Sequence, residues 1–119
     1  AWLKHGTHIN AIGANYEHRR ELDTDAVRAA CFICADDVEQ VRYEATDLIE
    51  PVKASVLQWP DVHSLADVVA GKLRGRTLRD DITLFKSLGV ALEDVALAVR
   101  AYEKAQVLGL GVTLPDLAG

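Results

Sequence analysis

The sequence predicts an α/β layer fold with about three parallel strands and flanking helices, in a single domain over residues 1–119. Short apolar segments with β-branched residues alternate with segments of helical spacing, which is the order expected of parallel strands joined by right-handed crossovers. Half of the residues are hydrophobic, so the chain can form one core. A complete doubly wound sheet has about five or six strands. The chain therefore corresponds to about half of such a fold.

The first strand is predicted within residues 6–13, where the apolar, β-branched stretch THINAIG ends in glycine. The loop GANYEHRR follows, and loops in this position usually carry function. In the next segment, ELDTDAVRAA, Asp23 or Thr24 can cap a short helix that turns Val27 inward. The N-terminal part of the chain is thus predicted to run strand, loop, helix.

A second, buried strand is predicted at residues 31–37, CFICADD. Side chains alternate between the two faces of a strand, so Cys31 and Cys34 should point in opposite directions. We expect two buried, reduced thiols that neither form a disulfide nor bind a metal. The four histidines lack the recurrent spacing of metal ligands, so no metal site is expected.

Helical spacing dominates the rest of the chain. Residues 38–57 predict a helix that Pro51 interrupts, and residues 59–71 predict another that stops at its final glycine. A basic, glycine-containing connection follows; it is either a solvated loop or a contact for a phosphate. Residues 81–89 predict the third strand, and residues 90–109 predict the clearest helix of the chain.

The net charge of −5 excludes the simplest kinds of nucleic-acid and membrane-surface binding, because an acidic protein is repelled by phosphate groups. No apolar run approaches the roughly 20 residues that a membrane-spanning helix needs. Residues 1–8 lack the charged start and apolar stretch of a signal peptide. We therefore expect a soluble, cytoplasmic protein with no nucleic-acid or membrane partner.

Two long segments carry a family resemblance: GTHINAIGANYEHRRELD at residues 6–23 and DDITLFKSLGVALEDVALAVRAYEKA at residues 80–105. Both resemble motifs of the ornithine cyclodeaminase and mu-crystallin family. Between them, CFICADDVEQVRYEATDL and GRTLRDD are also similar to family segments, in the family's order. The resemblance covers nearly the whole chain. It implies the C-terminal part of an NAD(P)-binding, Rossmann-like domain.

The resemblance also implies contact residues at two strand ends, where α/β sheets bind ligands. The loop after the first strand would line the nicotinamide end of NAD or NADP, Ser87 would lie against the cofactor, and Leu88 would lie near the substrate. The implied cofactor-binding residues are Ala11, Ile12, Gly13, Ala14, Arg19 and Ser87. The alternative is an inherited scaffold, in which these residues shape the strand ends and no ligand is bound.

No catalytic residue is predicted. Asn15 occupies the position where ornithine cyclodeaminases carry an aspartate that handles protons, and an amide cannot serve as that acid or base. Asparagine at this position is reminiscent of relatives that reduce ketimines or oxidise amino acids. The resemblance therefore leaves the parent's substrate open.

Two parts that the family resemblance implies do not occur in these residues: a G-x-G-x-x-G phosphate loop and the N-terminal substrate domain. We expect a truncated, non-catalytic or cryptic fragment with at most residual binding of a nucleotide or small molecule. Exposed sheet edges and apolar faces favour association, most simply as a homodimer. The alternative is the C-terminal portion of an NAD(P)-dependent amino-acid enzyme, of the ornithine cyclodeaminase, ketimine reductase or alanine dehydrogenase type, that needs a separate N-terminal chain. A third possibility is a structural interaction module.

Overall fold

The structure is a computed structural model that describes residues 2–112 and 114. The chain divides into two compact units, Ala1–Gly89 and Val90–Gly119. The first unit contains β1 (His8–Ala11), α1 (Thr24–Ala29), β2 (Phe32–Ala35), α2 (Val41–Glu44), α3 (Thr46–Lys53), a 3-10 turn (Trp59–Asp61), β3 (Val62–Ser64), α4 (Leu65–Val69) and β4 (Thr83–Lys86). The second unit contains α5 (Ala91–Leu108). Among the described residues, no helix is both long and apolar enough to cross a membrane.

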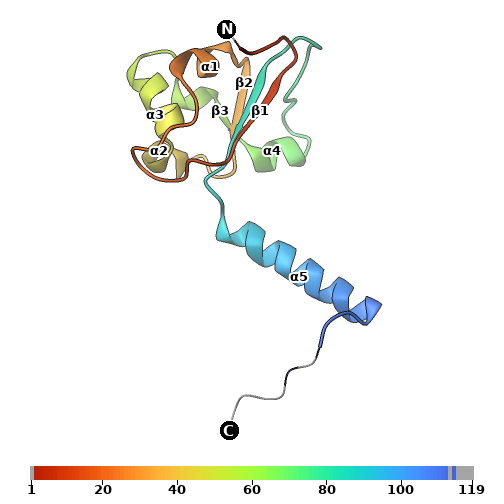
Figure 1. The fold of residues 1–119 in the computed structure, drawn as a ribbon. Helices are drawn as coiled ribbons and strands as arrows, with labels where there is room; N and C mark the ends of the chain where they lie inside the picture. Colours follow the sequence, from red (N-terminus) through yellow and green to blue (C-terminus); the bar gives the residue numbers. More distant parts are fainter. Residues whose placement is uncertain (1, 113, 115–119) are drawn as a thin grey trace. The chain divides into compact units, whose positions relative to one another are not determined.

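The strands of the first unit form one parallel sheet in the order β1-β4-β2-β3 (Figure 1). The last strand along the chain is therefore central: Leu84 of β4 is aligned with Ile9 of β1 on one side and Ile33 of β2 on the other. The predicted parallel α/β class is confirmed, and the sheet has one strand more than predicted. Because every strand runs the same way, all the carboxyl ends lie at one edge.

The additional strand is β3, and it corrects the prediction of a helix over residues 59–71. These residues form a 3-10 turn, then β3, then α4. Val62 pairs with Ile33 of β2 and is buried, and Ser64 caps α4 by accepting a hydrogen bond from the Ala66 N–H. A three-residue strand is too short to show a period of two, so the helical spacing around it was misleading.

The predicted interruption at Pro51 was also wrong. The helical segment breaks at Ala45, which has φ −89° and ψ 85° and separates α2 from α3. Pro51 is buried inside α3, two residues before its end at Lys53. A proline there removes only the one hydrogen bond that its N–H would have donated. Its own carbonyl accepts from Val56 N at 2.9 Å, which closes the helix end.

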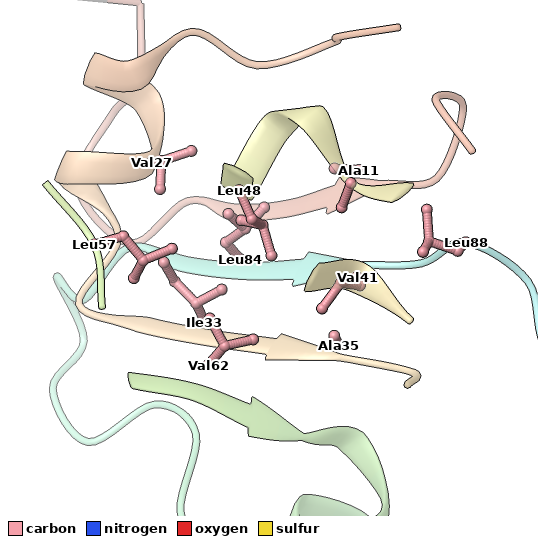
Figure 2. Close-up of a cluster of buried hydrophobic side chains, with 11 residues drawn as sticks. Ala11, Val27, Ile33, Ala35, Val41, Leu48, Leu57, Val62, Leu84 and Leu88 are labelled. Atoms are coloured by element: carbon pink, nitrogen blue, oxygen red, sulfur yellow. The ribbon is translucent and has the colours of Figure 1, made fainter. Parts of the chain in front are cut away.

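The core lies between one face of the sheet and helices α1, α2 and α3. Figure 2 shows Leu48 of α3 beside Leu84 of the central strand. Alternation along the strands selects the core positions, since successive side chains point to opposite faces. The buried hydrophobic cluster comprises Ala11, Val27, Ile33, Ala35, Val41, Ala45, Leu48, Leu57, Val62, Leu84 and Leu88.

The two cysteines differ in their surroundings, which corrects the expectation that both are buried. Both thiols are free. Cys34 is buried in β2, and burial raises the pKa of its thiol because the charged form is poorly solvated. Cys31 is exposed and directly precedes β2, and its Sγ donates to the carbonyl of Ile82 at 3.2 Å.

The second unit is dominated by α5, which spans 18 residues as its periodicity predicts. Glu93 and Asp94 lie in its first turn, where they oppose the positive end of the helix dipole. Gly109 ends the helix with φ +63°, a left-handed conformation that favours glycine. Several apolar side chains of this helix are exposed: Leu92, Val95, Leu97, Val99, Tyr102, Val107 and Leu108.

Candidate functional site

The candidate site lies at the carboxyl edge of the sheet, where the segments that follow three strands meet. These are the loop at residues 12–22 after β1, residues 36–40 after β2, and the turn at residues 87–89 after β4. Ser87 N donates to the Ala11 carbonyl at 3.1 Å, and Asp36 N donates to the Lys86 carbonyl at 3.3 Å. These hydrogen bonds continue the strand pairing to the last residues of β1 and β4, so the three segments start side by side at the edge where parallel sheets bind ligands.

A single carboxylate organises the turn after β4. Oδ2 of Asp36 accepts hydrogen bonds from Ser87 Oγ at 2.7 Å, Leu88 N at 2.9 Å and Gly89 N at 2.9 Å. Its other oxygen, Oδ1, accepts from Asp37 N at 2.9 Å. Gly89 has φ +84°, where any side chain would be strained, so glycine is required for this turn.

A buried ion pair supports the loop after β1. Lys86 lies on the core face of β4, and its Nζ is 2.9 Å from Oδ2 of Asp47 in α3, with neither side chain exposed to solvent. The same Nζ donates to the Ala14 carbonyl at 2.5 Å. Desolvating two charges is costly, so removing either partner leaves an uncompensated charge in the core. Because Asp47 fixes the Lys86 ammonium group, the hydrogen bond from Lys86 in turn fixes the position of the Ala14 backbone above the core.

Glu21 and Asp47 join the two ends of the loop at residues 12–22. Oδ1 of Asp47 accepts from Glu21 N at 2.7 Å and Leu22 N at 2.9 Å. Oε2 of Glu21 in turn accepts from Gly13 N at 2.8 Å and Ala14 N at 2.9 Å. A Cβ added at Gly13 would collide with the Glu21 carboxylate, so the close approach of the two requires glycine.

The predicted contact residues are placed unevenly around this edge. Ala11 and Ala14 are buried, whereas Ile12 is 66% exposed. Arg19 lies in the exposed part of the loop, with its guanidinium 5.6 Å from the centre of the Tyr16 ring.

Gly13 is exposed, Ser87 is half-buried, and the exposed Asn15 follows Ala14. The side chain of Leu88 is buried in the hydrophobic cluster, so only its backbone faces the edge. The structure thus brings Ala11 and Ser87 together directly, through the hydrogen bond between their backbones, and leaves Arg19 on the outer loop.

Four residues that order the site were not predicted as such: Glu21, Asp36, Asp47 and Lys86. Asp36 and Asp37 ended the predicted strand at residues 31–37, and Asp37 caps the turn that follows by accepting from Glu39 N and Gln40 N at 2.9 Å. The sequence did indicate that Lys86 is buried, because side chains two apart on a strand share a face and Leu84 is a core residue. Within the described part of the chain, no group of three or more His, Cys, Asp or Glu residues could hold a metal ion.

A parallel sheet whose functional loops meet at the carboxyl edge is the arrangement of α/β dinucleotide-binding domains. Comparison with known proteins agrees with this class. The chain belongs to the ornithine cyclodeaminase/mu-crystallin family, whose model matches residues 1–108.

Relatives with assigned activities match over nearly the whole chain. An alanine dehydrogenase of Archaeoglobus fulgidus is 38% identical over 111 residues, which are 92% of this chain and 34% of that protein. A Thermococcus litoralis Δ1-pyrroline-2-carboxylate reductase, solved with NADH and L-proline, has a TM-score of 0.83 and 42% identity, covering 95% of this chain and 35% of the other.

An archaeal alanine dehydrogenase dimer with bound NAD has a TM-score of 0.78 and 37% identity, covering 98% of this chain and 36% of the other. The chain thus spans about a third of the length of the relatives that it matches. The implied cofactor of the family, a nicotinamide dinucleotide, is the ligand that both of these solved relatives hold.

Proposed function

We propose that this chain forms the nicotinamide-end half of a dinucleotide site in an NAD(P)-dependent amino-acid or imino-acid oxidoreductase. The observation that carries this is the hydrogen-bonded contact between Ala11 and Ser87, with Asp36 fixing the turn beside it. The arrangement presents a fixed hydroxyl and an exposed apolar side chain, Ile12, at the ligand-binding edge of the sheet. The NADH- and NAD-bound relatives support the assignment of the ligand.

In this proposal the residues of the chain bind and orient, and none acts as an acid or base. The backbone of Ala11–Ala14 and the Ile12 side chain would pack against the nicotinamide, while Ser87 would hydrogen-bond to its substituent. The bound nicotinamide would supply the hydride chemistry. Asn15 favours an alanine dehydrogenase or ketimine reductase type over a cyclodeaminase, because an amide cannot exchange a proton as a carboxylate does.

The second candidate is a chain without activity of its own. These 119 residues contain no G-x-G-x-x-G segment, and in dinucleotide-binding folds that loop holds the pyrophosphate. Under this view a separate chain carrying the phosphate loop and substrate domain would complete the enzyme. Adding such a chain would then be necessary for hydride transfer, although nicotinamide contacts would remain measurable here.

Thermal unfolding of the purified chain with NADH, NADPH or NAD tests the proposal. A ligand that binds only the native state must raise the Tm. We expect a rise that Ile12→Glu abolishes, since a carboxylate would replace the apolar contact surface. The matched control is Val69→Glu, which changes a similarly exposed apolar residue at the end of α4 and should leave the rise intact. A Tm indifferent to every nucleotide would contradict the proposal.

We also infer self-association of the chain as a homodimer, and the archaeal alanine dehydrogenase relative was solved as a dimer. Two kinds of apolar surface are available for it. α5 exposes a series of aliphatic side chains, and the sheet face opposite the core has an apolar hollow of about 440 Å³ with Phe32, Leu65, Val68 and Phe85 among its lining. Sedimentation equilibrium measures the mass directly, and a strictly monomeric chain at micromolar concentration would overturn the inference.

A further inference from the structure

The hydrogen-bonding capacity of the Ser87 hydroxyl is nearly exhausted within the protein. A hydroxyl has one proton to donate and two lone pairs that accept. Ser87 Oγ is 2.7 Å from Oδ2 of Asp36, and an ionised carboxylate only accepts, so the Ser87 proton is committed to that bond. The Gly89 N–H is shared between two acceptors: it donates to Oδ2 of Asp36 at 2.9 Å and to the same Ser87 Oγ at 3.1 Å, and so it partly occupies one lone pair. One lone pair remains, and it can only accept.

Further hydrogen bonds hold the Asp36 carboxylate in place, so it keeps accepting the hydrogen bond from the Ser87 hydroxyl. Its Oδ2 also accepts from Leu88 N and Gly89 N, and its Oδ1 accepts from Asp37 N. Rotating the carboxylate away from Ser87 would therefore break several hydrogen bonds at once. Asp36 and Ser87 are both half-buried, so this arrangement lies at the surface of the site, where a ligand can reach it.

We propose that Asp36 is a positioning residue that makes the Ser87 hydroxyl a hydrogen-bond acceptor toward the ligand. The ligand group that fits is a donor, and on a nicotinamide this is the N–H₂ of the carboxamide. The site would thereby select dinucleotides that carry the amide and disfavour those with a carbonyl alone at the same position. This inference rests on the proposed function, in which the nicotinamide end binds beside Ser87.

Two dinucleotides distinguish a Ser87 hydroxyl that accepts a hydrogen bond from the ligand from one that donates. NAD carries the carboxamide, whereas 3-acetylpyridine adenine dinucleotide has a methyl group in place of the N–H₂ and keeps the carbonyl. Calorimetry on the full chain gives the ratio of the two dissociation constants. We expect the wild-type chain to prefer NAD by about tenfold, since an acceptor facing a methyl group loses its hydrogen bond. A positional role is read from this ratio, which a general loss of stability would not change.

Variants of Asp36 and Ser87 then test whether the preference for NAD comes from the hydrogen bond between these two residues. Asp36→Ala frees the Ser87 proton, so the hydroxyl can donate to the carbonyl of either ligand, and the ratio should fall to within about threefold. Ser87→Ala should remove the preference altogether. Asp36→Asn should retain it, because the amide oxygen still accepts from Ser87. Asp37→Ala is the matched control: Asp37 caps a neighbouring turn, does not contact Ser87, and should leave the ratio unchanged.

Each outcome decides a different claim. Wild-type binding with an unchanged ratio in Asp36→Ala overturns the positioning role and leaves the proposed function standing. Failure of the wild-type chain to bind either dinucleotide overturns the proposed function and this inference together. If Asp36→Ala does not fold, Ser87→Ala is sufficient, because a preference that survives loss of the hydroxyl cannot come from it.

Discussion

Lys86 of β4 and Asp47 of α3 form an ion pair at 2.9 Å from which solvent is excluded on both sides. The pair lies beneath the loop that follows β1 and reaches it through the Ala14 carbonyl and the backbone N–H groups of Glu21 and Leu22. Buried pairs contribute little net stability compared with apolar packing. Their value here is geometric, since they hold the loop in one conformation beside Ser87.

Replacing Lys86 by methionine should destabilise the chain strongly. The substitution leaves the Asp47 charge buried without a partner, and losses of about 3–5 kcal/mol are typical of such a change. Urea denaturation measures the free energy of unfolding. Lys53→Met is the control, because Lys53 pairs with Glu50 on the surface of α3 and should matter far less. A Lys86→Met chain within about 1 kcal/mol of wild type would show that the pair is not effectively buried.

Gly13→Ala should disturb the loop through its collision with the Glu21 carboxylate. The Glu21 carboxylate is the end of a flexible side chain and can move aside, so we expect a loss of at most about 1 kcal/mol, from the weakened hydrogen bonds. The backbone N–H groups of residues 13 and 14, which donate to Glu21, should exchange their hydrogens faster. Combining Gly13→Ala with Glu21→Ala should cost less than the sum of the two changes, because the second removes the atoms that clash. Additive costs would refute the contact.

The control for this pair is Gly75→Ala. A Cβ at Gly75 would lie 3.6 Å from the Phe32 ring, an ordinary van der Waals distance. Its effect on the free energy of unfolding should be small, and the exchange of the Gly13 and Ala14 amides should not change.

Asp81 should contribute to acid sensitivity. Hydrogen bonds from Leu78 N, Thr77 N and Thr77 Oγ1 lower the pKa of its carboxyl group below the ordinary 3.8. Because the folded-state pKa is the lower one, the contribution is fully present above the unfolded value and is lost as the pH falls through the folded value. The Tm, recorded from about pH 5 to about pH 2.5, should therefore fall more steeply in wild type than in Asp81→Asn. Parallel curves for the two proteins would contradict this assignment.

The two thiols should react at very different rates. Cys31 is exposed, whereas Cys34 is buried with a raised thiol pKa, which reduces its thiolate fraction at neutral pH. Ellman's reagent should label one thiol rapidly in the native chain and both in denaturant. Cys31→Ser should abolish the rapid phase, whereas Cys34→Ser should leave it. Two rapid phases in the native chain would mean that β2 is accessible.

Sequence periodicity predicted those elements in which local and tertiary preferences agree. The α5 helix is long enough for its apolar spacing to be unmistakable, and β1, β2 and β4 coincide with apolar, β-branched or aromatic runs. β3 was not predicted, because its conformation depends on pairing with β2, a contact that local spacing does not encode. The break at Ala45 was missed for a different reason: alanine favours helix, whereas Pro51 is the residue that ordinarily breaks one.

The candidate site was predictable only in part. The resemblance identified the loop after β1 and Ser87 as contact positions, which stay predictions until a ligand is measured. It did not identify Asp36, Asp47 or Glu21, because their roles arise from three-dimensional pairings between distant segments. Asp36 meets Ser87 only once β2 and β4 lie side by side. Polar residues that bind other protein groups leave little local pattern in a sequence.

The position of β4 has a consequence for biosynthesis. It is the last of the four described strands along the chain, yet it lies between β1 and β2, and the pairing of His8 with Thr83 bridges 75 positions of chain. A nascent chain that has emerged only as far as β3 cannot join β1 to the other strands. Non-local pairing of this kind slows folding, because the entropy of closing long loops is lost before contacts form. Until β4 inserts, β1 pairs with none of the other described strands, and this is the interval in which a chaperone would protect these segments from aggregation.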